Sequence, residues 1–129
     1  MLKKTITFTD YNGVERTEDF YFNLNEAELT EMQLMKEGGL KEWLEKMVKS
    51  ENRVEIMKMF KMIILKAYGE KSSDGRRFIK SDEISENFTQ TEAYNKLFME
   101  LVSNETTMSE FVKGIVPSAW NKSDAVEVK

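Results

Sequence analysis

The chain has 129 residues, of which 40% are hydrophobic and 11% aromatic, enough for one domain with a buried core. It contains neither Cys nor His, which excludes disulfides, zinc–thiolate and iron–sulfur centres, cysteine nucleophiles and imidazole bases. A net charge of −4 argues against nucleic-acid binding through a broad basic surface.

The first 23 residues predict a β-hairpin. Two runs alternate apolar and polar residues on either side of the turn signal Asp10-Tyr11-Asn12-Gly13. A two-residue loop would put Phe20 and Phe22 on the side of Thr5, whereas a three-residue loop over 11–13 collects the apolar residues on one face. We therefore expect the longer loop, with Gly13 at positive φ. That face then holds Leu2, Ile6, Phe8, Val14, Phe20 and Phe22, with Lys4, Arg16 and Glu18 where the hairpin projects beyond the core.

Two helices are predicted after the hairpin. Asn25 is placed to cap the first, and Glu28 stands three residues later, as in a capping box. The glycine pair at 38–39 ends this helix. A short helix follows over about 40–49, with Trp43 on its apolar stripe.

The strongest helical pattern runs from Asn52 or Arg53 to Tyr68, with Gly69 as the stop. Its apolar face covers about half of the helix circumference. Two interpretations remain open: a central helix in a monomer, or a helix whose second side is buried against another subunit. The face comprises Ile56, Met57, Met59, Phe60, Ile63, Ile64, Ala67 and Tyr68.

Residues 70–80 predict a polar loop that turns at Asp74-Gly75. A short helix then starts near Ser81, with Phe88 as its apolar anchor.

The last two helices are indicated by caps and apolar periodicity. The first is capped by Thr89 or Thr91 and carries the stripe Tyr94, Leu97, Phe98, Leu101 and Val102. After a break at 104–107, Thr107 and Glu110 resemble a capping box, and Pro117 stops the helix. Its stripe is Met108, Phe111, Val112, Ile115 and Val116.

These elements predict an α+β fold in which an N-terminal β-hairpin packs on a mostly helical domain of four to six helices. We expect a single domain over 1–117, with the hairpin in 1–23, the helical part in 24–117, and a loosely ordered tail in 118–129. The longest apolar run, 62–65, is too short to span a membrane, and the N-terminus lacks the apolar stretch of a signal peptide. We expect a soluble cytosolic protein.

The residues indicate binding rather than catalysis. Acidic residues are abundant, but no spacing singles out a catalytic pair, and no catalytic, cofactor or metal residues are predicted. Methionine is common on adaptable binding surfaces, although it also fills helical cores. The loop 71–77 could hold a phosphate or an acidic partner segment, or could simply be a solvated turn. The candidate partner-binding residues are Met57, Met59, Met62, Arg76, Arg77 and Trp120.

Four stretches carry a family resemblance: Tyr11–Leu24, Ala67–Phe78, Thr91–Leu101 and Phe111–Pro117. Together they resemble the tail assembly chaperones of siphophages that infect Gram-positive bacteria. The resemblance implies a protein that acts in the host cytoplasm and is absent from the mature virion. It implies binding of the helical, aggregation-prone tape measure protein, which the chaperone keeps soluble until tail-tube subunits polymerise around it. It also implies a longer frameshifted form that binds tail-tube protein.

Two alternatives belong to other classes. One is a structural tail or head–tail component that stays in the particle. The other is a regulatory or host-interaction binding protein.

Overall fold

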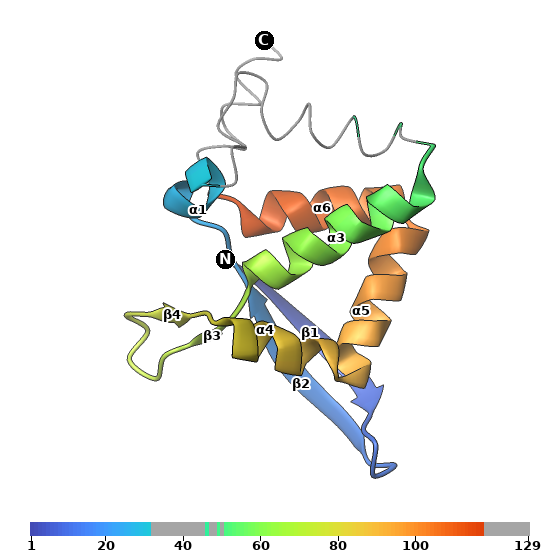
Figure 1. Cartoon of the computed structure of the whole chain (residues 1–129). Coiled ribbons are helices and arrows are strands. Elements are labelled where there is room, and N and C mark those ends of the chain that lie inside the picture. The colour runs from blue at the N-terminus through green and yellow to red at the C-terminus, as the bar shows by residue number, and fades with distance from the viewer. Residues whose placement is uncertain (32–45, 47–48, 50, 118–129) are drawn as a thin grey trace.

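The computed structural model describes residues 1–31, 46, 49 and 51–117 (Figure 1). A four-stranded sheet and five helices in these residues confirm the predicted α+β fold. The predicted helix over 40–49 with Trp43, the stop at 38–39 and the tail 118–129 lie wholly or almost wholly outside the described residues. The elements are β1 (Leu2–Thr9), β2 (Glu15–Phe22), α1 (Glu26–Glu31), α3 (Arg53–Ala67), β3 (Tyr68–Lys71), β4 (Phe78–Ile79), α4 (Asp82–Thr89), α5 (Glu92–Ser103) and α6 (Glu105–Ile115).

The β1–β2 hairpin has the predicted register, with Leu2 opposite Phe22 and Phe8 opposite Arg16. Gly13 adopts φ 80°, so the three-residue loop is confirmed. Val14 has the predicted phase, opposite Asp10, but it is 52% exposed and is not part of the core. Val14 lies at the hairpin tip beyond the helices, where no core covers it. Arg16 is exposed near the tip, as expected.

The predicted capping box begins α1. The Asn25 side chain accepts a hydrogen bond from the Glu28 backbone N–H at 2.8 Å, and the Glu28 carboxylate accepts one from the Asn25 N–H at 3.1 Å. Leu29, in the middle of this short helix, is fully buried. The reciprocal bonds fix where the chain leaves the sheet and enters the helical layer.

The predicted loop over 70–80 is wrong at both of its ends, because β3 and β4 pair there as a second hairpin. Gly69 does not simply stop α3 but lies in β3 opposite Tyr21. A Cβ at Gly69 would lie 2.8 Å from Cε2 of Phe78 and 2.9 Å from the carbonyl oxygen of Ile79. Only glycine leaves room for β4 and the Phe78 ring at this distance.

The last three of the described helices begin at side-chain caps. Ser81 caps α4 and Thr91 caps α5, in line with the sequence patterns. The predicted capping box at Thr107 is wrong: Asn104 caps α6 instead, accepting from the N–H groups of Thr106 and Thr107. Asparagine can act as the N-cap because its side-chain oxygen reaches both of these N–H groups, which have no partner within the helix. The helix ends before Pro117, as predicted.

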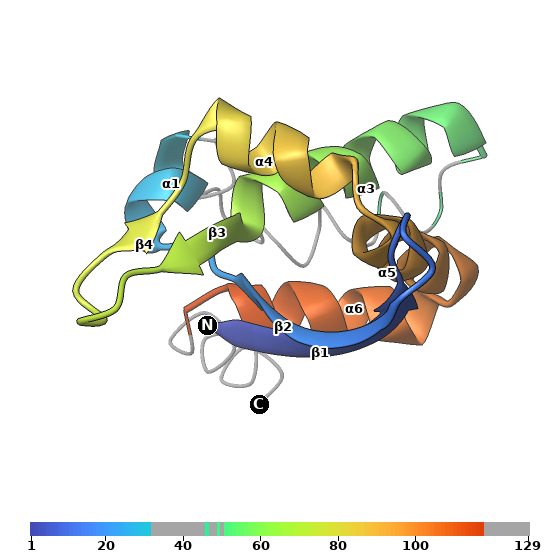
Figure 2. The same ribbon diagram turned by 90° about the horizontal axis from the view of Figure 1, so that it is seen from below.

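The helices α3, α5 and α6 lie on the concave side of the curved β1–β2 hairpin, while β3 and β4 project away from them (Figures 1 and 2). The core between these layers is wholly apolar among the described residues. An aromatic cluster joins sheet and helices, with Tyr68 stacked on Phe88 at 4.0 Å between ring centroids. The largest fully buried side chains are Phe22, Leu24, Leu29, Ile63, Ile64, Leu97, Leu101, Val112 and Ile115.

Candidate protein-binding surfaces

Within the described ranges, no buried side chain is polar or charged, and no group of acidic side chains is arranged to hold a metal ion. None of the helices described is long and apolar enough to cross a membrane. The features that distinguish the surface are exposed apolar side chains and a protruding cationic hairpin.

The predicted methionine stripe of α3 divides into three environments. Met57 is 44% exposed and Met62 is 40% exposed, whereas Met59 is half-buried and packs against the core. Successive residues turn about 100° around a helix, so Met57 and Met62 lie about 140° apart and do not share a face. Met59 therefore contributes to stability, and the other two methionines face solvent in different directions.

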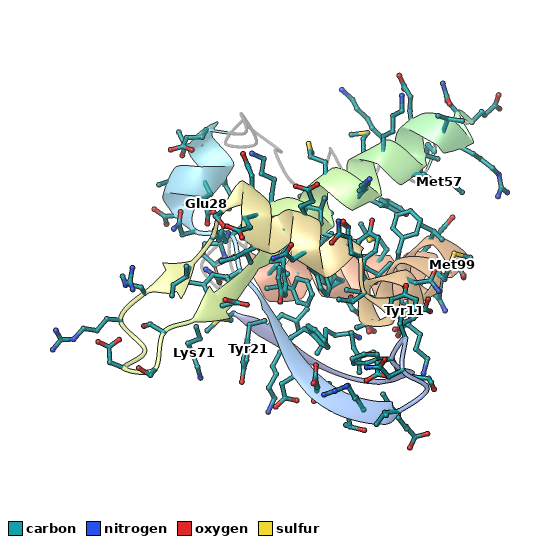
Figure 3. All side chains as sticks on the ribbon, turned by 60° about the horizontal axis from the view of Figure 1, so that its bottom comes forward. Tyr11, Tyr21, Glu28, Met57, Lys71 and Met99 are labelled. Carbon is teal, nitrogen blue, oxygen red and sulfur yellow. The ribbon has the colours of Figure 1, made fainter. Side chains whose placement is uncertain are left out.

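Met57 has exposed apolar neighbours that sequence reasoning did not select as site residues. Val54 stands one helical turn earlier and is 63% exposed, and Met99 of α5 is 54% exposed. Met57 and Met99 lie at the same end of the molecule, where α3 and α5 are in contact (Figure 3). We call Val54, Met57 and Met99 the methionine surface. Helical periodicity could have indicated that Met99 is exposed, because it lies on the opposite side of α5 from the buried Leu97.

The other predicted residues lie at the tip of the β3–β4 hairpin. Arg76 and Arg77 are exposed, and no ion pair joins either of them to another described residue. Ser72 and Asp74 order the turn: the Asp74 carboxylate accepts from the Arg76 N–H at 3.0 Å, and the Ser72 hydroxyl accepts from the Arg77 N–H at 3.0 Å. The Arg76 N–H, followed by the Ser72 hydroxyl, lowers the pKa of the Asp74 carboxyl. The hairpin thus presents two cations on an ordered turn.

The two surfaces do not form one site. The methionine surface and the β3–β4 hairpin lie at opposite ends of the molecule (Figures 1 and 3). Near the base of the hairpin, the Lys71 ammonium lies 5.0 Å from the centre of the Tyr21 ring. The remaining predicted residue, Trp120, lies outside the described residues.

A small α+β domain with an exposed methionine surface and an ordered cationic hairpin has the features of a protein-binding module. The chain belongs to the phage tail assembly chaperone family, whose family model matches residues 1–128. This membership confirms, over nearly the whole chain, that the sequence resembles phage tail assembly chaperones. No curated protein and no solved structure matches the chain.

Proposed function

We propose that this tail assembly chaperone binds the tape measure protein of its phage and keeps it soluble until the tail tube assembles around it. It acts by stoichiometric binding and not by catalysis, in the cytoplasm of the infected cell, and it is absent from the finished particle. The observation that carries the proposal is the methionine surface of a chain that belongs to this family.

The chemistry of the methionine surface suits a long helical client. A helix with an apolar face needs an apolar surface on its holder, and the flexible, polarizable methionine side chain can repack against different segments of such a client. Val54 and Met57 supply neighbouring apolar side chains on α3, and Met99 of α5 supplies a further exposed apolar side chain at the same end of the molecule (Figure 3). The net charge of −4 helps to keep a loaded complex in solution.

The remaining candidates have secondary roles in this proposal. Arg76 and Arg77 contact acidic segments of the client, and Met62 and Trp120 supply further apolar contacts. A longer frameshifted form recruits tail-tube protein. Several copies associate along one client molecule.

Co-expression with the tape measure protein tests the proposed surface. The double substitution V54E/M57E places two charges on the methionine surface and should move most of the client from the soluble to the pellet fraction, because charged side chains cannot pack against its apolar stripe. Centrifugation followed by gel quantification of the client is the measurement.

The control is V14E, which introduces one of these charges at a site of similar exposure outside the methionine surface, on the tip of the β1–β2 hairpin. It should leave the client soluble, and circular dichroism should show that both variants are folded. A client that stays fully soluble with folded V54E/M57E would rule out the methionine surface. Abundant copies of the chain in purified virions, measured by mass spectrometry, would contradict the assembly role and favour a structural tail component.

A further inference from the structure

Strand β1 is the edge of the described sheet, whose order is β1-β2-β3-β4. Asp10, just beyond β1, donates its backbone N–H to the Val14 carbonyl and so faces the second arm of the hairpin. Because strand residues alternate, the even-numbered residues of β1 direct their backbone groups to β2, and the odd-numbered residues direct theirs outward. The outward-facing backbone groups belong to Lys3, Thr5, Thr7 and Thr9.

Contacts on both sides of β1 support this alternation. The Thr7 hydroxyl lies 2.9 Å from the Thr17 hydroxyl, and Thr5 donates to Asp19 at 2.6 Å, as expected for pairs that are not bonded to each other through their backbones. On the outer side, the Lys96 ammonium of α5 donates to the Thr7 carbonyl. A side-chain ammonium thus occupies the place where the backbone N–H of a further strand would bind.

A groove runs along this edge, between β1 and the flank of α5. Two cations border it: Lys96, and Lys4, whose ammonium lies 3.8 Å from the Glu100 carboxylate. The side chains of these residues are not buried, so the bonds across the groove can exchange with those of a partner. The groove is lined by Lys4, Thr5, Ile6, Thr7, Lys96, Leu97, Met99, Glu100 and Ser103.

We propose that the outer edge of β1 binds an extended, acidic segment of a partner protein by strand addition. The backbone of the segment pairs with Thr5 and Thr7, and its N–H replaces the Lys96 ammonium on the Thr7 carbonyl. The displaced ammonium needs a new acceptor, and a carboxylate on the added strand supplies it at the cationic border of the groove. The groove shares Met99 with the methionine surface but contains neither Val54 nor Met57, and the inference does not rest on the proposed function.

The probe is a synthetic peptide of alternating valine and glutamate, capped at both ends and as long as β1 (8 residues). Amide hydrogen exchange of the full chain, followed by NMR, reports the pairing residue by residue. Added peptide should slow exchange at the Thr5 and Thr7 amides and leave Ile6 and Phe8 unchanged, because the latter amides already bond to β2. Binding affinity is measured by titration calorimetry.

Two controls separate strand addition from charge attraction. The same peptide with N-methyl groups on the amides of its pairing edge keeps every charge and should not bind. Substitution K96M removes both the ammonium that competes for the Thr7 carbonyl and the new partner of the peptide carboxylate, so the diagnostic quantity is charge preference: the native chain should bind the peptide more tightly than the same peptide with glutamine in place of glutamate, and K96M should lose part of this preference. Substitution K58M, which removes an exposed cation from α3, should leave the affinity unchanged.

Three results would overturn the proposal. The first is absent or non-alternating protection, and the second is equal binding of the methylated peptide. The third is slow amide exchange at Thr5 and Thr7 without peptide. If this protection depends on protein concentration, a second copy of the chain occupies the edge. If it persists on dilution, the edge is covered within the chain itself. None of these results bears on the V54E/M57E experiment.

Discussion

Lys80 donates hydrogen bonds to three acceptors on three segments of the chain. Its ammonium lies 2.7 Å from the Asn23 carbonyl oxygen, 2.5 Å from the Glu28 carboxylate and 2.7 Å from the Lys66 carbonyl oxygen. These groups belong to the end of the first hairpin, to α1 and to the end of α3. Burial lowers the pKa of Lys80 even though Glu28 favours the charged form, so desolvation offsets much of the attraction between them.

Removing the ammonium alone should therefore be costly, because Glu28 and two carbonyl groups lose a partner at once. We expect K80M to lower the free energy of unfolding by about 1–3 kcal/mol, measured by urea denaturation. The control K58M removes an exposed cation and should change it by less than about 0.5 kcal/mol. An equal, small effect of both substitutions would show that Lys80 does not hold the three segments together.

At the scale of single elements, two glycines give opposite expectations for the same substitution. In β3, G69A places a methyl group 2.9 Å from the Ile79 carbonyl oxygen, a backbone atom that moves only if the strand pair separates. In α6, the nearest atom to a Cβ at Gly114 is Cδ1 of Leu2 at 3.1 Å, the end of a flexible side chain. Alanine is favoured over glycine within a helix by up to about 1 kcal/mol.

We expect G69A to destabilise the protein by about 1–3 kcal/mol, as is typical of overpacking, and G114A to be neutral or stabilising. Thermal unfolding followed by circular dichroism compares the two variants directly. A G69A protein as stable as the parent would mean that β3 and β4 do not pack as closely as described.

At the scale of the whole molecule, stability at high pH depends on the aromatic cluster. Burial raises the pKa of Tyr68 above its usual value of 10.0, and burial likewise raises the pKa of Tyr94. At a pH between the pKa of these phenols in the unfolded chain and their pKa in the folded chain, the phenols keep their protons only in the folded chain. Stability contributed by these phenols is present below about pH 10 and is lost as the pH rises through the folded-state pKa.

The Y68F variant keeps the ring stacked on Phe88 and removes one ionising group. It should lose less stability than the parent when urea denaturation is repeated from pH 9 to 11. If the free energy of unfolding falls equally with pH in both proteins, folding does not raise the pKa of Tyr68.

Most of the fold could be predicted from the sequence because its signals are local. Gly13 and the alternating residues around it were sufficient for the register of the first hairpin, and the caps at Asn25, Ser81 and Thr91 were sufficient for three helix starts. The β3–β4 hairpin was missed because its strands are short and polar, and β3 pairs with distant β2. Periodicity does not report such long-range pairing.

The candidate site was harder to predict, because exposure depends on tertiary packing. The sequence selected Met57, Met59 and Met62 as one stripe, yet Met59 packs on the core and the other two face different directions. Met99 lies at the same end of the molecule as Met57 only because α5 packs against α3 (Figure 3). The cationic border of the β1 groove likewise depends on Lys96 lying against a strand 89 residues earlier in the chain.

The N-terminal hairpin meets α6 where the Leu24 N–H, just after β2, donates to the Ile115 carbonyl oxygen and where the Leu2 side chain lies beside Gly114. Contacts this distant in sequence require a large loop to close before they contribute stability, which slows folding. The hairpin is made first by the ribosome but cannot bury its apolar face fully until α6 has been synthesised. We therefore expect the docking of α6 to limit how soon a newly made molecule reaches its folded form.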